Sequence, residues 1–310
     1  MWWYVAKRLL QTIPVIIGAT FIISLMTYLR QIGGDPVAGM FGDRPVSDAV
    51  RVQIEQQYHF DEPFIIQWLL FLKGAVVGDF GTAFSGQPVL DLVKRAFPVT
   101  VTLAVMALIF EMVLGIIVGT IAGLRRGRWF DQFSLVLSLA LIAIPIFVVG
   151  FVLQWLFGVE WKIFPATVGG DWTIEKLIIP AIVLGTTSFA YIVRLTRGSV
   201  AESLVSDHVR TARAKGLSNG RVVRNHVLRN SLVPVVTFLG VDLGALMAGA
   251  VITEGIFNIP GVGNLAFRAI QQGQSPTVIS VITIMVLVYV VTSLVVDLLY
   301  AALDPRIRYA

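Results

Sequence analysis

The 310-residue sequence contains no cysteine, only three histidines and few charged residues. Without cysteine it has no disulfide framework, no thiolate metal site and no cysteine nucleophile. Charged residues make up 14% of the chain and hydrophobic residues 56%, whereas a soluble domain averages about 25% and 45–50%. These proportions exclude an ordinary globular enzyme and also a disordered chain, which has low hydrophobicity and high net charge. They indicate an integral membrane protein.

The sequence contains several long apolar runs. A helix needs about 20 mostly apolar residues to cross a hydrocarbon core about 30 Å thick. Six stretches satisfy this length and predict an all-α membrane protein with six transmembrane helices: Leu9–Leu29, Val99–Gly123, Phe133–Phe157, Ile178–Leu195, Leu232–Phe257 and Val278–Tyr300. The first stretch is too long for a secretory signal and lacks a small-x-small cleavage site, so we expect it to be retained.

The distribution of Lys and Arg predicts the orientation. With six spans and a cytoplasmic N-terminus, the inner segments hold 15 of the 24 basic residues but only four of the 19 acidic ones. This excess follows the positive-inside rule. A seventh span at Phe64–Val77 would place Arg125–Arg128 and Arg194–Arg229 on opposite sides, so we expect a shorter interfacial or buried helix there. Both termini are then cytoplasmic, and no single basic patch points to a nucleic acid.

The spans divide the chain into four parts. Residues 1–29 carry the first span, residues 30–98 form an extracytoplasmic helical segment, residues 99–303 hold five spans, and residues 304–310 form a cytoplasmic tail. In the second part, apolar residues four apart (Val50, Ile54, Tyr58) predict a helix within Val46–Tyr58. A structured segment of this length either covers a pathway and receives a partner or only stiffens the outer rim.

The cytoplasmic loop of residues 196–231 carries the most specific pattern. Ser206 or Asp207 can begin a short helix, and Gly216 can end it in the left-handed conformation. Ser218 or Asn219 can then begin a second helix that leads through Arg221–Arg229 toward the membrane at Pro234. We expect a compact protrusion.

Small residues in the first of these helices, Thr211, Ala212 and Ala214, would allow another protein to approach closely. The alternative is a solvated loop whose arginines only set the topology.

Several runs resemble one family. Arg210-Thr211-Ala212-Arg213-Ala214-Lys215-Gly216, followed by His226-Val227-Leu228-Arg229-Asn230, is similar to the permease subunits of bacterial ATP-binding cassette (ABC) importers. The resemblance is to the dipeptide/oligopeptide/nickel permeases, closest to the dipeptide-permease B-type subunits. Supporting runs occur in the family's order along nearly the whole chain: Gly34-Asp35-Pro36, Gly78-Asp79-Phe80-Gly81, Glu254-Gly255-Ile256-Phe257, Pro260-Gly261-Val262-Gly263 and Asp304-Pro305-Arg306-Ile307-Arg308.

The resemblance implies a type I ABC importer-like permease fold in a bacterial plasma membrane and a set of partners. These are a sister permease, two ATP-binding subunits and an extracytoplasmic substrate-binding protein. The expected cargo is a di- or oligopeptide, with a nickel or metal-chelate permease as the alternative within the family. The residues implied in docking the ATPase are Asp207, Arg210, Thr211, Ala212, Arg213, Ala214, Lys215 and Gly216.

This loop corresponds to the superfamily's "EAA" motif, but its leading Glu is absent. Aligning on Gly216 places the triplet at Arg210-Thr211-Ala212, so no interaction of that Glu is expected here. The chain also lacks a G-x-x-x-x-G-K-[ST] phosphate loop. We therefore expect no catalytic residue and no cofactor in this chain, with ATP and Mg bound by the partner subunits.

Four acidic residues, Glu111, Asp242, Glu254 and Asp297, fall within or at the edges of spans. An ionised carboxylate there costs several kcal/mol unless it faces water, a cation or the bundle interior. Asp242, Glu254 and Glu111 are our candidates for a translocation path; structural pairing or capping is the alternative, and is favoured for Asp297. A rival function follows from these acids: a stand-alone proton-coupled transporter or channel.

Other features suggest structural roles. Gly115, Gly119 and Gly123 form a small-xxx-small row that predicts a helix-packing seam rather than a ligand site. Pro145 permits a kink in the third span, and Trp2-Trp3-Tyr4 fits an interfacial belt. His59, His208 and His226 lie outside the spans and far apart, so we expect no metal site.

Overall fold

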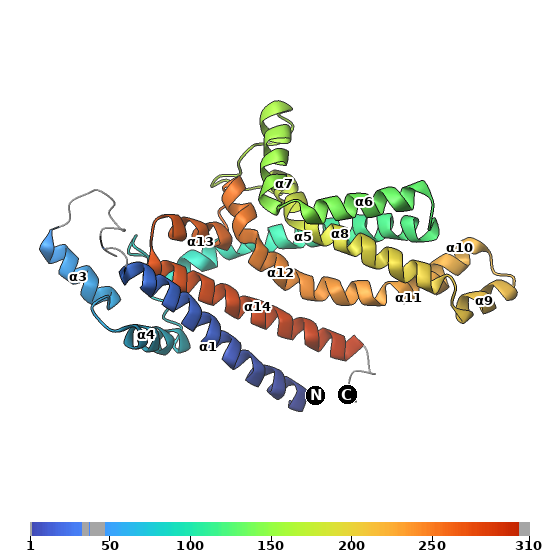
Figure 1. Cartoon of the computed structure of the whole chain (residues 1–310). Coiled ribbons are helices and arrows are strands. Elements are labelled where there is room, and N and C mark those ends of the chain that lie inside the picture. Colours follow the sequence, from blue (N-terminus) through green and yellow to red (C-terminus); the bar gives the residue numbers. More distant parts are fainter. Residues whose placement is uncertain (1, 33–36, 38–46, 304–310) are drawn as a thin grey trace. The chain divides into compact units, whose positions relative to one another are not determined.

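The computed structural model describes residues 2–32, 37 and 47–303 of the chain. These residues form helices joined by turns and loops, and no β-strand (Figure 1). The predicted motifs at Gly34-Asp35-Pro36 and Asp304–Arg308 fall outside the described residues, as do the side chains of Asp297 and of Trp2, Trp3 and Tyr4.

The helices follow one another along the chain in a simple order. They are α1 (Trp2–Ile32), α3 (Asp48–Tyr58), α4 (Phe64–Val76), α5 (Val89–Leu124), α6 (Trp129–Ala143), α7 (Ile146–Leu153), the π-helical η1 (Gln154–Glu160), the 3₁₀ turn η2 (Glu175–Leu177), α8 (Ile178–Ser203), α9 (Asp207–Ala214), α10 (Asn219–Val222), the π-helical η3 (Val223–Leu228), α11 (Arg229–Ser231), α12 (Val233–Phe257), α13 (Val262–Gln271) and α14 (Ser275–Leu303).

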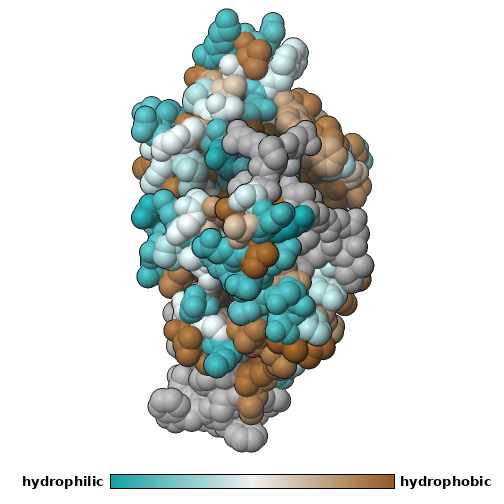
Figure 2. Space-filling view, turned by 90° about the vertical axis from the view of Figure 1, so that its left-hand side faces the viewer, coloured by the Kyte–Doolittle hydropathy of each residue, from teal (hydrophilic) through white to brown (hydrophobic). Residues whose placement is uncertain are grey.

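Four described helices are long and apolar enough to cross a membrane: Leu10–Leu29 in α1, α5, Glu175–Ser203 and Ser275–Val296 in α14. The number rises to six if each of two bent helix pairs counts as one span. Large apolar side chains such as Met26 and Val136 are 69% and 66% exposed. Figure 2 shows hydrophobic residues (brown) on the molecular surface beside hydrophilic groups (teal), as expected where lipid replaces water as the solvent.

The third predicted span, Phe133–Phe157, is not one continuous helix. Helix α6 ends at Ala143, Ile144 is extended (φ −84°, ψ 125°), and the axis bends by 101° before the α7–η1 segment. Pro145 causes this break because it has no N–H to donate and it disfavours a helical conformation at the preceding residue. The predicted kink therefore becomes a full break.

The chain divides into two compact units. Unit 1 contains residues 1–100 and 259–310, and unit 2 contains Val101–Asn258. In unit 1, α1 packs against α14 and α4, and α13 packs against α14. Its core combines residues near the start of α5 with residues of α13 and α14: Phe80, Ala83, Val89, Val93, Val262, Ala266, Val281 and Ile284.

In unit 2, α8 is the central helix and contacts α6, α7 and α12. It is the most buried of the candidate spans, at 61% of its apolar window compared with 11% for α1. The helix continues to Ser203, so the first eight residues of the predicted 196–231 loop extend the helix beyond the predicted span.

Candidate functional site

Residues 204–231, here called the loop module, fold as two short helical segments joined by a tight turn. Ser206 has the extended backbone typical of an N-cap (φ −70°, ψ 155°), and α9 follows it. The segment ends at Lys215 and Gly216, and Gly216 has a φ of +76° that favours glycine. Ser218 stands with an extended backbone at the N-cap position of the second segment, α10–η3–α11. The predicted helix, glycine turn and second helix are therefore confirmed.

A small apolar core joins the loop module to the end of α8. Val209 and Ala212 of α9 pack against Val200, Val222 and Val227. Ala212 is only 4% exposed and Val209 is fully buried. Ala212 therefore supports the fold of the loop module from inside and does not lie on its outer surface.

The outer surface of α9 is polar and mostly basic. The other residues implied in docking are all exposed: Asp207, Arg210, Thr211, Arg213, Ala214, Lys215 and Gly216. The Thr211 hydroxyl donates to the Asp207 carbonyl at 2.9 Å, and Arg210 lies 3.5 Å from the Asp207 carboxylate. Arg221, Arg224 and Arg229 of the second segment are exposed as well. This surface suits a partner of opposite charge.

Hydrogen bonds fix the loop module to the end of α8. The Ser231 hydroxyl donates to the Ser199 carbonyl at 3.1 Å and to the Val227 carbonyl at 2.8 Å. The side chain of Asn230 lies 3.0 Å from His208 Nε2 and so joins the second segment to α9. These hydrogen bonds join α9, the second segment and the end of α8 into one connected unit.

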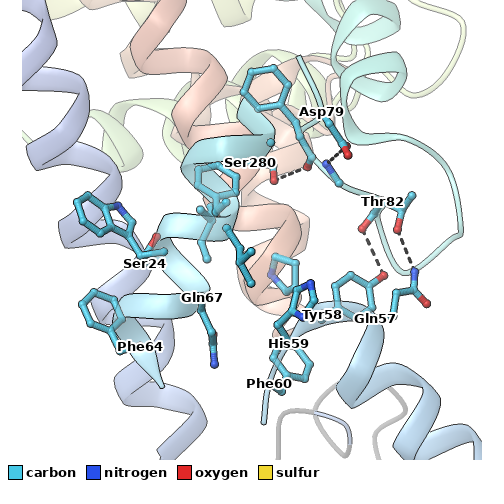
Figure 3. A pocket seen from close by; sticks show the side chains of 18 residues that line it. Ser24, Gln57, Tyr58, His59, Phe60, Phe64, Gln67, Asp79, Thr82 and Ser280 are labelled. Carbon is cyan, nitrogen blue, oxygen red and sulfur yellow. Dashed lines mark hydrogen bonds between the residues drawn. The ribbon is translucent and has the colours of Figure 1, made fainter. Parts of the chain in front are cut away.

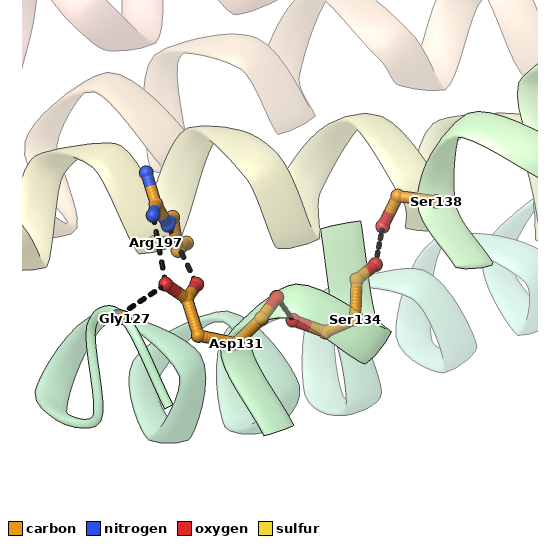
Figure 4. Close-up of polar contacts among 5 residues, drawn as sticks. All are labelled: Gly127, Asp131, Ser134, Ser138 and Arg197. Atoms are coloured by element: carbon orange, nitrogen blue, oxygen red, sulfur yellow. Dashed lines mark hydrogen bonds and ion pairs between the residues drawn. The ribbon is translucent and has the colours of Figure 1, made fainter. Parts of the chain in front are cut away.

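An ion pair joins α8 to the start of α6 (Figure 4). Arg197 donates from Nε and Nη2 to the two oxygens of Asp131, both at 2.8 Å. The backbone N–H of Gly127 also donates to Asp131 at 2.8 Å. The Asp131 side chain is 2% exposed and that of Arg197 23% exposed. Bidentate geometry of this kind is strong and directional.

In the sequence, Asp131 and Arg197 contribute to the topology prediction only as charges of inner segments. The signal that points to Asp131 is a polar stripe on a mostly apolar helix, made by Asp131, Ser134 and Ser138 at helical spacing. All three are buried, and Ser138 donates to the Ser134 carbonyl at 2.7 Å. The spacing therefore predicts a buried polar face. It does not predict the partner, because Arg197 lies 66 positions away in the sequence.

The glycine row of α5 lies directly against α8. A Cβ atom on Gly115 would stand 2.7 Å from Ile192, one on Gly119 2.6 Å from Thr196, and one on Gly123 2.8 Å from Val200. Real Cβ atoms do not approach so closely, so only glycine permits this spacing of the two helices.

Two of the three candidate pathway acids lie together. Glu111 of α5 is fully buried, neither of its oxygens has a hydrogen-bond partner among the described residues, and Asp242 of α12 lies within its electrostatic reach. Asp242 is 8% exposed and accepts a hydrogen bond of 3.0 Å from Ser188. Glu254 is also buried, but it follows Asp242 by twelve residues on the same helix, or about 18 Å. It does not join the pair.

Comparison with known proteins identifies the class of this chain. Residues 115–309 match the family described as "Binding-protein-dependent transport system inner membrane component". The match covers more than half of the chain, and the chain belongs to this family.

Individual relatives extend the similarity to the whole length. The chain is 33% identical over 333 residues to the dipeptide transport system permease protein DppB of Alkalihalophilus pseudofirmus, with 99% of both chains covered. It is 37% identical over 312 residues to the glutathione transport system permease protein GsiC of Escherichia coli K12, again with 99% of both chains covered. The predicted relationship to ABC importer permeases is confirmed.

Proposed function

We propose that this chain is one of two membrane subunits of an ATP-driven importer for di- or oligopeptides. The support is its membership of the transport family and its full-length similarity to proteins named for dipeptide and glutathione transport, both of which are peptide cargoes. A sister permease would complete the pathway, and an extracytoplasmic binding protein would deliver the peptide. The loop module and both chain termini would face the cytoplasm.

The loop module carries this proposal. It is a folded protrusion with an apolar interior and a basic outer surface, which is more than a topology-setting loop requires. We assign the contact with the ATP-binding subunit to the exposed residues of α9, with Ala212 holding the helix in place from behind. ATP and Mg would be bound by the partner subunits, so chemical energy reaches this chain as a displacement of α9.

The Asp131–Arg197 ion pair would pass that displacement on. It joins α8, to which the loop module is fixed, to α6 and to the turn at Gly127. Nucleotide binding in the partners would then bias the chain between inward- and outward-open states, which is a coupling free energy between two sites. Asp131 and Arg197 are positioning residues in this scheme, because neither touches nucleotide or peptide.

Purification of the complete importer with its neighbouring subunits tests the proposal. ATP hydrolysis is measured in nanodiscs with and without the binding protein loaded with a dipeptide. We expect the loaded binding protein to stimulate hydrolysis and uptake together. The absence of an associated ATPase, with uptake following a proton gradient, would contradict the proposal.

A stand-alone proton-coupled transporter is the second candidate, and the Glu111–Asp242 pair favours it. Two carboxyl groups buried together cost several kcal/mol unless a proton or cation lies between them. Glu111→Gln and Asp242→Asn separate the two functions. A carrier of this kind loses its proton dependence in these variants, whereas an ATP-driven importer continues to require ATP.

A further inference from the structure

Unit 1 contains a pocket of about 280 Å³ that the proposed transport steps do not use (Figure 3). Its walls come from α1, the end of α3, α4, the connection at residues 79–82 and the start of α14. The volume lies just below the range of about 300–1,000 Å³ for small-molecule sites. All of the lining residues belong to unit 1.

Aromatic side chains form much of the wall. Tyr58, Phe60, Phe64 and Trp68 line the pocket, and Tyr58 stacks on Phe60 with ring centroids 5.6 Å apart. Phe64 and Trp68 each lie 5.2 Å from Phe21 of α1 in edge-to-face contacts. Aromatic faces attract organic cations as well as apolar groups.

Hydrogen-bonded polar side chains and one carboxylate, that of Asp79, form the polar part of the wall. Gln57 and Tyr58 donate to Thr82 at 3.2 and 3.3 Å and so fix the rim. Asp79 accepts one hydrogen bond, from the Gly81 N–H at 2.9 Å. Among the described residues, Asp79 is the one acidic residue that lines the pocket, and His59 is the one histidine. Neither Lys nor Arg of the described chain lines it. An ammonium group fits this lining better than an anion.

The pocket borders an apolar stretch that is long enough to cross a membrane. Ser24, which lines it, is 6% exposed, has no hydrogen-bond partner for its hydroxyl among the described residues, and belongs to the apolar stretch Leu10–Leu29. Trp68 donates to Thr20 of that stretch at 3.3 Å, which fixes α4 to α1. On α4, Ile65 and Leu69 are 51% and 53% exposed, as expected for a helix in contact with acyl chains.

We propose that this pocket binds the headgroup of a phospholipid that carries a primary amine. Asp79 and the aromatic faces would hold the ammonium group, and the acyl chains would lie along the exposed apolar side of α4. A lipid is favoured over a soluble amine because the pocket joins an apolar span to an exposed apolar helix. This site is separate from the loop module and from the Glu111–Asp242 pair.

Native mass spectrometry of the chain, purified with the subunits that accompany it, tests this site. The protein is equilibrated in nanodiscs containing equal amounts of phosphatidylethanolamine and phosphatidylglycerol and transferred to mild detergent, and the retained lipids are counted. We expect phosphatidylethanolamine to be retained in excess. Asp79→Asn keeps the acceptor for Gly81 but removes the charge, and should reduce that excess about fivefold to tenfold.

Two comparisons sharpen the result. Asp91→Asn is the matched control, because Asp91 is a half-exposed acid of the same unit that does not line the pocket. Ser24→Phe should fill the cavity and release the lipid. Equal excess in Asp79→Asn and Asp91→Asn, or no excess in the unmodified protein, would overturn the proposal even if Ser24→Phe fails to fold. Displacement of the lipid by added glycylglycine would identify a soluble amine as the occupant and also overturn it.

Discussion

At the scale of single residues, small side chains in unit 2 decide how closely helices approach. Ala212 lies between α9 and the second segment of the loop module, whereas Ala214, two positions later, is exposed. Gly119 touches α8, whereas a Cβ atom added to Gly198 on α8 would meet no other atom within 4 Å. In the alanine pair and in the glycine pair, one residue contacts a neighbouring helix, and the other is a control of the same residue type that makes no such contact.

The alanine pair separates folding from docking. Ala212→Asp places an unpaired charge in the apolar core of the loop module, at a cost of several kcal/mol. We expect trypsin to cut this loop rapidly in membranes that contain the variant, with loss of ATP-linked uptake as a consequence. Ala214→Asp should leave trypsin resistance unchanged and weaken only the association of the ATPase. Equal trypsin resistance in both variants would contradict the burial of Ala212.

The glycine pair tests the seam between α5 and α8. Gly119→Ala forces a Cβ within 2.6 Å of the Val193 carbonyl and of Thr196 Cβ. Overpacking of this kind costs about 1–3 kcal/mol, so the thermal unfolding midpoint of the purified protein should fall. Gly198→Ala adds a methyl group to open space and should leave the midpoint unchanged or slightly raised. A midpoint for Gly119→Ala equal to that of Gly198→Ala would show that the helices are less closely packed.

At the scale of elements, one long helix connects most of unit 2. Helix α8 carries the loop module at one end, touches the glycines of α5, and binds α6 through Arg197. By contrast, the α6–α7 pair is broken by 101° at Pro145. The Asp131–Arg197 ion pair therefore joins α8 to α6, the helix that precedes the break.

Arg197→Lys tests the connection between α8 and α6. Lysine keeps the charge but cannot reproduce the bidentate contact with Asp131, and the loss of one hydrogen bond to a charged group costs about 1.5–3 kcal/mol. We expect a lower thermal midpoint and a several-fold fall in peptide taken up per ATP hydrolysed. Arg194→Lys is the control, because Arg194 lies one turn away on α8 and is exposed. If both variants transport peptide with unchanged stoichiometry, the ion pair has no part in coupling.

At the scale of the whole molecule, the absence of cysteine allows the membrane topology to be measured by labelling single introduced cysteines. Gln56 of α3 and Thr211 of α9 are both exposed, and the proposed orientation places them on opposite sides of the membrane. Because the chain has no cysteine of its own, a single introduced thiol reports one position without background.

We expect a membrane-impermeant maleimide to label Gln56→Cys in spheroplasts and to label Thr211→Cys only after the membrane is permeabilised. Each variant serves as the control for the other, since both positions are exposed on short helices. Labelling of Thr211→Cys in sealed spheroplasts would reverse the orientation and remove the loop module from the side where ATP is hydrolysed.

The sequence by itself determined the features that depend on neighbours along the chain. The apolar runs predicted where α1, α5, α8, α12 and α14 lie, because crossing a bilayer requires only length and hydropathy. Gly216 predicted the turn after α9, because a left-handed φ is a local property of glycine. The family motifs predicted the class of transporter, which the comparisons confirmed.

The tertiary structure alone decided the contacts between distant segments. It turned Ala212 toward Val222 and Val227, joined Asp131 to Arg197, and brought Glu111 near Asp242. It also converted the kink at Pro145 into a break and enclosed the pocket beside Trp68. Hydropathy and spacing describe each helix separately, whereas these features depend on which faces of two helices meet, and that is set by packing across the fold.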